Sequence, residues 1–319
     1  MLALAAPASA QLPVTQGPPP TTPAPPAEAK LSVGIATKGI TDHHKLWLLA
    51  GDKVKVRGTL TPYVDGQVVV VKLFKGGKHV GHRNAKVTPN KNGAGYYSAV
   101  FHINSAGSYS TLSRHEPTDK QKAANSPRRR FGVVAGRAHR GSSGETVRLL
   151  QIGLRRLAYV APVTGRFEAG TTRAVLAFRK VQRWRRNGSA SRDVFRRLFR
   201  GQGGFNLRYT KGRHLEGDLG RQVLVFADHG KPYQIYTMSS GKPSTPTVRG
   251  AFNFYRKQPG TNAHGMVYSS YFHGGYAVHG YPSVPATYPA SHGCIRVPVP
   301  DARRIYGEIS LGERIFVYR

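Results

Sequence analysis

The chain has 319 residues, enough for two or three domains, and carries 48 Lys+Arg against 15 Asp+Glu, a net charge of +33. Such an excess favours a polyanionic partner, but the basic residues are spread along the chain and form no recognisable nucleic-acid-binding module, so we expect no nucleic-acid partner. No stretch approaches 18 consecutive apolar residues, so we also expect no transmembrane segment.

The first 30 residues predict export followed by a spacer. Residues 1–10 form a short apolar run that ends in Ala8-Ser9-Ala10, the small-residue pattern of a signal-peptide cleavage site, although no basic segment precedes it. An Ala-rich terminus is the alternative. Residues 11–30 are rich in Pro, Thr and Ala and predict an extended linker. An exported chain with one cysteine cannot form an internal disulfide, which leaves intermolecular pairing or a reactive thiol.

Residues 31–135 predict an immunoglobulin-like β-sandwich, because short strand patterns recur between turn pairs such as Asp65-Gly66 and Asn92-Gly93. Apolar and basic residues alternate from Lys53 to Gly58, as in a half-buried strand, whereas the run Val68 to Val71 predicts a more buried one. Five of the six histidines in this part of the chain could be imagined as metal ligands, but their spacing matches no metal-site signature (His43, His44, His79, His82 and His102).

Residues 139–201 change to a helical period and predict a three-helix unit. Val147, Leu150, Leu154 and Leu157 share one helix face. We expect Ser142 with Glu145 to form a capping box, and Thr171 and Ser191 to cap the second and third helices.

This helical unit resembles the peptidoglycan-binding domain type 1 family. The resemblance rests on Leu150-Gln151, on the turn Gly165-Arg166-Phe167 and on the helix from Thr172 to Phe178. Arg179 departs from the pattern, because the family usually has Gln there. The resemblance implies that peptidoglycan is a ligand; a helical spacer is the alternative.

Residues 206–319 return to strand patterns and predict a mainly β domain of about 100 residues. Strands are expected at 222–227, 233–237, 265–272, 275–278 and 314–318, and the loop that contains Cys294 is expected to lead into a short helix at 301–309.

Cys294 is the only cysteine, with His292 two residues and His279 fifteen residues before it. A thiol becomes a strong nucleophile as the thiolate, which an imidazole near it in space can generate. A buried, inert cysteine is the alternative. Gly293 lets the backbone turn tightly before Cys294 and point amide N–H groups at a developing oxyanion.

This last domain resembles the L,D-transpeptidase (YkuD-type) catalytic domain. The resemblance rests on His279-Gly280, on Ser291-His292-Gly293-Cys294-Ile295-Arg296 and on the upstream Ser239-Ser240-Gly241 segment. It implies a cysteine acyltransferase of the bacterial cell wall or periplasm, acting on peptidoglycan stem peptides without a metal or organic cofactor. We expect His279 to be the base, held by a backbone carbonyl near Gly280.

Further roles are expected around this pair. Ser291 and His292 would orient the loop, and Arg296 would bind a substrate carboxylate. A zinc site built from the histidines at 264, 273, 279 and 292 matches no standard spacing. The sequence thus predicts a multidomain, mainly β protein: a β-sandwich, a helical peptidoglycan-binding-like unit and an L,D-transpeptidase domain.

Three alternatives stay open. Water instead of an amine could resolve the acyl-enzyme, which would make the protein an L,D-carboxypeptidase or endopeptidase. A non-catalytic cationic protein bound to anionic cell-wall polymer is the second alternative, and nucleic-acid binding, supported by charge alone, is the third.

Overall fold

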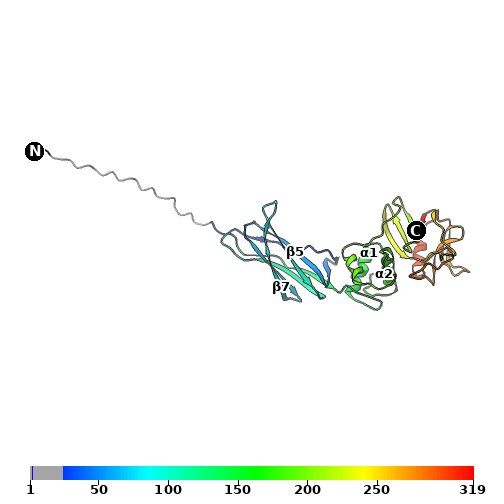
Figure 1. Cartoon of the computed structure of the whole chain (residues 1–319), viewed down its shortest axis with the longest axis horizontal. Helices are drawn as coiled ribbons and strands as arrows, with labels where there is room; N and C mark the ends of the chain where they lie inside the picture. The colour runs from blue at the N-terminus through cyan, green and yellow to red at the C-terminus, as the bar shows by residue number, and fades with distance from the viewer. Residues whose placement is uncertain (1, 3–23) are drawn as a thin grey trace.

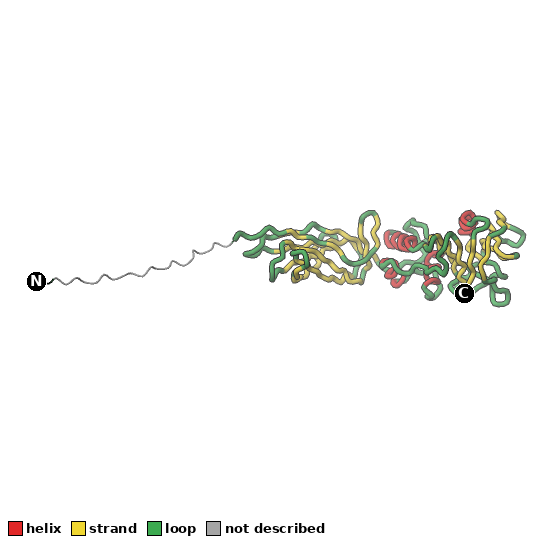
Figure 2. Tube along the Cα trace, turned by 90° about the horizontal axis from the view of Figure 1, so that it is seen from above, coloured by secondary structure: helices red, strands yellow, loops and turns green. Residues whose placement is uncertain are grey.

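The computed structural model describes residue 2 and residues 24–319. Apart from residue 2, the predicted leader lies outside the described residues, as does most of the Pro-rich segment. The rest of the described chain forms a β-sandwich, a helical unit and a second mainly β unit, which follow one another along the long axis of the molecule (Figures 1 and 2). The predicted multidomain, mainly β fold class is confirmed.

The first unit consists of two sheets around one apolar core. One sheet has the order β1-β5-β9-β8 with β2 also paired to β5, and the other has the order β3-β4-β12-β10-β6-β7 with β11 paired to β10. The strands of the first sheet are β1 (Lys30–Leu31), β2 (Gly34–Ile35), β5 (Asp52–Thr61), β8 (Thr88–Pro89) and β9 (Gly95–Ile103). Those of the second are β3 (Ile40–Asp42), β4 (Lys45–Leu49), β6 (Val68–Lys75), β7 (Lys78–Lys86), β10 (Gly107–His115), β11 (Ala124–Asn125) and β12 (Arg129–Val134).

Side-chain alternation explains most of this unit. Val54 and Val56 in β5 are fully buried and face Phe101 and Ala99 of β9 in register, as the sequence pattern predicts. The prediction of a more buried strand at 68–71 is wrong, because β6 alternates as well and Val68 is 45% exposed. Strand β7 was not predicted: it is an almost wholly exposed edge strand, so its sequence lacks an apolar alternation.

The second unit contains α1 (Glu145–Arg156), α2 (Ala169–Val181) and α3 (Arg192–Phe199). The predicted face of α1 is buried through Val147, Leu150 and Leu154, while Leu157 ends the helix as its C-cap and is partly buried. These residues pack with Phe178 and Phe195 from the other two helices in a single core.

Two of the three predicted helix caps are wrong. Gly144, at φ 93°, is the N-cap of α1, and the Ser142 hydroxyl instead accepts a hydrogen bond from the backbone N–H of His139. Thr171 lies inside α2, where its hydroxyl accepts a bond from the Gln151 side chain. Ser191 does occupy the N-cap position of α3, without a side-chain capping bond. The Ser142 hydroxyl is thus used in a local turn before the helix, and the Thr171 hydroxyl in a tertiary hydrogen bond.

The third unit contains two further sheets, of order β15-β14-β13-β21-β16 and β17-β18-β19-β20. Their strands are β13 (His214–Asp218), β14 (Val223–Asp228), β15 (Lys231–Thr237), β16 (Gly250–Asn253), β17 (Arg256–Thr261), β18 (Val267–His273), β19 (Tyr276–Tyr281), β20 (Ile295–Pro298) and β21 (Arg314–Tyr318), and the helix is α4 (Val299–Glu308). The helix predicted at 301–309 is present as α4, but the Cys294 loop does not lead into it. Strand β20 comes between them and pairs in parallel with β19, so the cysteine is placed by a sheet.

The helical unit packs against both of its neighbours. One continuous core joins Ile40 and Leu49 of the sandwich, the three helices, and Val223, Val225 and Ile235 of the last unit. Three arginines on the helices also pair with carboxylates of the flanking units: Arg148 with Asp42 (3.0 Å), Arg192 with Asp52 (2.9 Å) and Arg173 with Asp301 (2.8 Å). A shared apolar core of this kind disfavours free motion between units.

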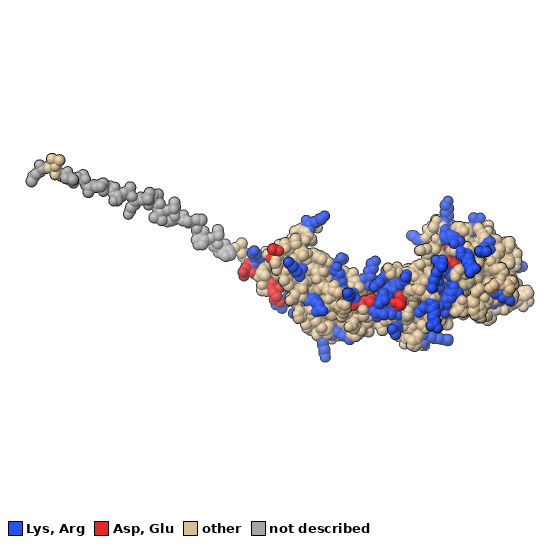
Figure 3. All heavy atoms as spheres, viewed as in Figure 1, with Lys and Arg blue, Asp and Glu red and all other residues tan. Residues whose placement is uncertain are grey.

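Basic side chains are scattered over the face of the molecule shown in Figure 3, on all three units, and outnumber the acidic ones there. Among the described helices, none combines the length and the apolar character needed to cross a membrane.

Candidate active site

Strand pairing brings Cys294 close to His279. In the parallel pair of β19 and β20, Val278 lies opposite Ile295 and His279 opposite Arg296, so one more step of this register places Cys294 beside Ala277. Side chains two residues apart on a strand point to the same face. Cys294 and His279 therefore lie on one face of the sheet, at neighbouring positions, although fifteen residues separate them in the sequence.

His279 is held in a single orientation. Its ring is 3% exposed, its Nδ1 lies 2.9 Å from the carbonyl oxygen of Gly280, and the Tyr281 ring meets it edge-on. Because a carbonyl oxygen can only accept, Nδ1 carries a proton and Nε2 is left as the proton acceptor in the neutral ring. Burial lowers the pKa of His279 to about 4, and the charge of Arg296 acts in the same direction. The imidazole is therefore neutral near pH 7.

The Cys294 thiol is half-buried and lies 3.7 Å from the carbonyl oxygen of Gly275. Burial raises the pKa of Cys294, while the backbone N–H of Ala277 and the charge of Arg296 partly oppose that shift. The thiol thus keeps its proton near neutral pH, and the site holds a neutral thiol next to a neutral imidazole.

Ser291 organises the turn before Cys294. Its buried hydroxyl donates to the carbonyl oxygen of Cys294 (2.5 Å) and accepts from the backbone N–H of Gly293 (3.1 Å). Gly293 has φ 119°, and a Cβ atom there would lie 2.4 Å from the ring of Tyr276. Only glycine suits both the conformation and the space at this position.

His292 and Arg296 point to different partners. His292 is exposed, and its Nε2 lies 3.3 Å from the Lys242 ammonium. Arg296 donates to the Ala290 carbonyl (3.1 Å) and stacks over the Tyr281 ring at 3.9 Å. Tyr276 and Tyr281 were not predicted as part of the site, because nothing in their local spacing marks them and only the sheet brings them to the Cys294 loop.

Two family models match the chain. The L,D-transpeptidase catalytic domain matches residues 212–317, and a putative peptidoglycan binding domain matches residues 143–198. The crystal structure of residues 123–326 of the L,D-transpeptidase from Xylanimonas cellulosilytica DSM 15894 is 32% identical, with a TM-score of 0.54, over 58% of this chain and 98% of that one. The chain belongs to the L,D-transpeptidase family.

More distant structures are also found. An L,D-transpeptidase (Yku) from Stackebrandtia nassauensis is 20% identical over 57% of this chain and 95% of its own, with a TM-score of 0.37. One from Mycobacterium smegmatis is 13% identical over 91% of this chain and 100% of its own, with a TM-score of 0.31. Among curated proteins, no match to the chain is found.

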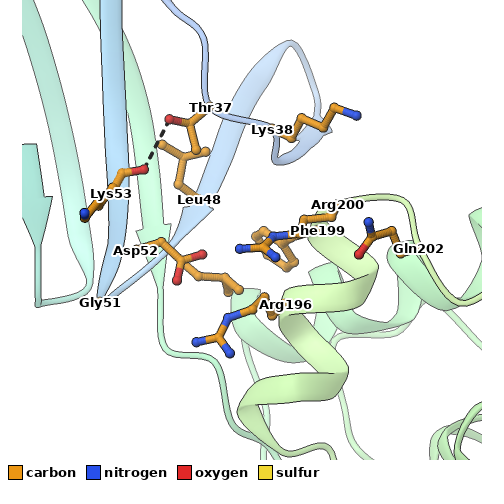
Figure 4. Close-up of a pocket in the computed structure, with 11 residues that line it drawn as sticks. Thr37, Lys38, Leu48, Gly51, Asp52, Lys53, Arg196, Phe199, Arg200 and Gln202 are labelled. Atoms are coloured by element: carbon orange, nitrogen blue, oxygen red, sulfur yellow. Dashed lines mark hydrogen bonds between the residues drawn. The ribbon is translucent and has the colours of Figure 1, made fainter. Parts of the chain in front are cut away.

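This L,D-transpeptidase family member has a second candidate site, a cleft of about 620 Å³ between the sandwich and α3 (Figure 4). The cleft is lined by Thr37, Lys38, Leu48, Leu49, Gly51, Asp52, Lys53, Arg196, Phe199, Arg200 and Gln202. The carboxylate of Asp52 is neutralised by Arg192. Cations thus outnumber the one acid, so the cleft favours an anionic ligand.

Among the described residues, no three or more His, Cys, Asp or Glu side chains are grouped so that they could hold a metal ion.

Proposed function

We propose that the chain forms 3→3 cross-links in peptidoglycan, with Cys294 as the nucleophile and His279 as its general base. The observation that carries this proposal is the juxtaposition of Cys294 and a neutral His279 whose Nδ1 is committed to the Gly280 carbonyl. That bond leaves Nε2 to accept the thiol proton. The Gly280 carbonyl orients the base, as a third group does in other nucleophile–base pairs.

In the first step, Nε2 of His279 takes the thiol proton as the sulfur of Cys294 attacks the carbonyl carbon between the third residue and the fourth, D-Ala, of a tetrapeptide stem. The Gly293 N–H already donates to Ser291, so we assign stabilisation of the oxyanion to the N–H of Cys294. The tetrahedral intermediate then expels D-Ala, whose amine takes the proton from the imidazolium, and a thioester remains on Cys294.

In the second step, a side-chain amine of a neighbouring stem attacks the thioester. His279 accepts the amine proton and returns it to the departing sulfur, so the enzyme is regenerated without a metal or organic cofactor. Water as the acceptor would give the L,D-carboxypeptidase or endopeptidase reaction instead. Whether the amine or water attacks the thioester depends on how completely the site excludes water.

Other residues support these steps. Ser291 and Gly293 hold the turn that presents Cys294, and Gly280 supplies the carbonyl that fixes the base. Arg296 has one guanidinium nitrogen on Ala290 and can offer others to a stem-peptide carboxylate. Exposed His292, beside Lys242, is placed to meet substrate at the rim.

The products of a reaction with a purified disaccharide-tetrapeptide test the proposal. We expect a cross-linked dimer lacking one D-Ala, seen by mass spectrometry, and no product from Cys294→Ala. Tripeptide alone would assign hydrolysis, and product formation by Cys294→Ala would refute the mechanism. A wild-type protein that forms no product but binds isolated walls would favour the non-catalytic alternative.

We also assign an anionic cell-wall polymer as a second partner and place the protein outside the cytoplasm, in the cell wall or periplasm. The basic cleft of Figure 4 supports the partner assignment. Replacing Lys38, Arg196 and Arg200 by Gln should weaken sedimentation with isolated walls, most strongly at low salt. Replacing three exposed lysines of β7 and the neighbouring loop (Lys78, Lys86 and Lys91) is the matched control. Equal loss in both variants would indicate a non-specific charge effect.

A further inference from the structure

Lys180 is a buried lysine that the proposed reaction does not use. It lies in the last turn of α2 and is 1% exposed. Its ammonium reaches out of the helical unit and donates to three acceptors of the catalytic unit: the Thr237 hydroxyl (2.7 Å), the Met238 carbonyl (2.9 Å) and the Gln222 carbonyl (3.2 Å).

The chemistry of this contact is unusual for a core position. None of the three partners is a carboxylate, so the cost of burying an ammonium is offset only by hydrogen bonds. Burial lowers the pKa of Lys180 to about 7, with a further contribution from the charge of Arg186. An ammonium has three protons to donate, and three acceptors are present. An apolar side chain would fill the space more simply but would remove the donor of the Met238 carbonyl, whereas the Gln222 carbonyl would keep the Met238 N–H (3.1 Å).

The Met238 carbonyl is connected to the Cys294 segment through the next residue along the chain. Met238 is followed by Ser239, whose N–H donates to the Arg296 carbonyl, while the Arg296 N–H donates back to Ser239 (both 2.9 Å). Arg296 is two residues from Cys294 and lies opposite His279 in the sheet.

The Gln222 carbonyl is connected to the same segment through a second set of hydrogen bonds. Gln222 receives the Ser240 N–H on its side-chain oxygen (2.9 Å), and its amide nitrogen donates to the Ser240 hydroxyl (2.7 Å). The Ser240 carbonyl in turn accepts the Ser291 N–H (2.9 Å). Ser291 holds Gly293 and Cys294, so one route from Lys180 ends on the turn that carries the thiol and the other on the strand that follows it.

We propose that Lys180 is a positioning residue for the reaction at Cys294, through which the helical unit fixes the 238–241 segment beneath the nucleophile loop. This inference rests on the proposed function of Cys294. It makes the helical unit a structural part of the catalytic site as well as a peptidoglycan-binding-like module, because a displacement of about 1 Å at a reacting group can cost about a hundredfold in rate.

The test compares full-length Lys180→Met with wild type and with Lys231→Met, an exposed lysine at the far end of β15. Two quantities are measured: the second-order rate of Cys294 acylation by a carbapenem, followed by intact mass, and amide hydrogen exchange by mass spectrometry. We expect acylation by Lys180→Met to be about tenfold to hundredfold slower. We expect faster exchange confined to 237–241 and 290–296, with the Lys231→Met control like wild type.

A second pair of variants covers the case in which Lys180→Met does not fold. Thr237→Val removes one acceptor at nearly constant shape, whereas Thr237→Ser keeps the hydroxyl. Slower acylation in the Val variant with near wild-type rates in the Ser variant supports the inference.

Three outcomes overturn the Lys180 inference. In the first, Lys180→Met is acylated at the wild-type rate and exchanges like wild type at 237–241 and 290–296. In the second, its exchange is faster evenly over the whole chain, which indicates general destabilisation, and in the third, Thr237→Val and Thr237→Ser are both acylated like wild type. If wild type itself is not acylated, the proposed function fails. The exchange pattern at 237–241 and 290–296 then decides the Lys180 inference alone.

Discussion

The protonation state of His279 makes a sharp prediction about pH. If His279 is the base, acylation of Cys294 requires the neutral imidazole, and the acid limb of the rate profile follows the pKa of that ring. Lowering the pH from 7.5 to 4.5 is therefore the perturbation of interest.

The structure sets the size of the effect. The ring is 3% exposed and its pKa is about 4, against 6.5 for an ordinary histidine. This difference corresponds to roughly 3 kcal/mol against protonation. With a pKa of 4, most of the rate survives at pH 4.5, whereas an unperturbed histidine would be about 99% protonated there and the rate would fall about hundredfold.

The assay is the second-order rate of carbapenem acylation measured by intact mass between pH 4 and 8, with buffers matched in ionic strength. His279→Gln keeps a polar side chain but lacks the base, so its rate should be lower by about 10²- to 10⁴-fold. His292→Gln is the matched control and should stay within a few-fold of wild type. A wild-type profile that halves near pH 6.5, or a His292→Gln variant that loses as much rate as His279→Gln, would refute the reasoning.

Further predictions concern stability and the loop. Because the pKa of His279 is lower in the folded than in the unfolded protein, its contribution to stability is fully present above about pH 6.5 and is lost as the pH falls toward 4. Urea unfolding should therefore show a loss of up to roughly 3 kcal/mol over this pH range. The His279→Gln variant should not show this pH-dependent loss. Gly293→Ala should fold less stably and be acylated at least about tenfold more slowly, because it combines φ 119° with a clash against a tyrosine ring; a wild-type rate would contradict this. Phe178→Ala removes a fully buried ring of the shared core and should cost about 3–5 kcal/mol in denaturant unfolding, with a loss under about 1 kcal/mol as the contrary result. Arg173→Met breaks the two-bond pair with Asp301 and should cost about 1–2 kcal/mol at low salt and less at high salt; an equal loss at both salt concentrations would point to lost packing instead.

The helical unit shows how far local pattern reaches. Its three helices and the buried face of α1 follow from apolar residues three and four positions apart, a spacing that lies on one helix face in any context. The capping prediction at Ser142 failed because its hydroxyl bonds to the backbone N–H of His139 in a local turn, and the one at Thr171 failed because its hydroxyl bonds to Gln151 of another helix. Capping preference is worth about 1 kcal/mol, which one alternative hydrogen bond matches.

In the catalytic unit, too, some features follow from the local sequence and others do not. The sequence by itself determined which groups are available to react: a single thiol, a glycine before it and two histidines within fifteen residues, in an order that resembles one family. It did not reveal β20, a four-residue strand too short to show a period, and so it predicted that the Cys294 loop leads into the helix at 301–309.

The family resemblance already favoured His279 as the base, but only the tertiary structure shows how His279 comes to lie on the face of the thiol and what holds the loop. The parallel register of β19 with β20 puts His279 on the face of Cys294, whereas His292, nearer in sequence, is exposed. The link from Lys180 to this loop joins residues 58 positions apart at its longest hydrogen-bonded step. Local sequence specifies which face of an element is apolar and which groups can react. Pairings between distant segments depend on the packing of the whole chain, and those pairings place the groups that would react.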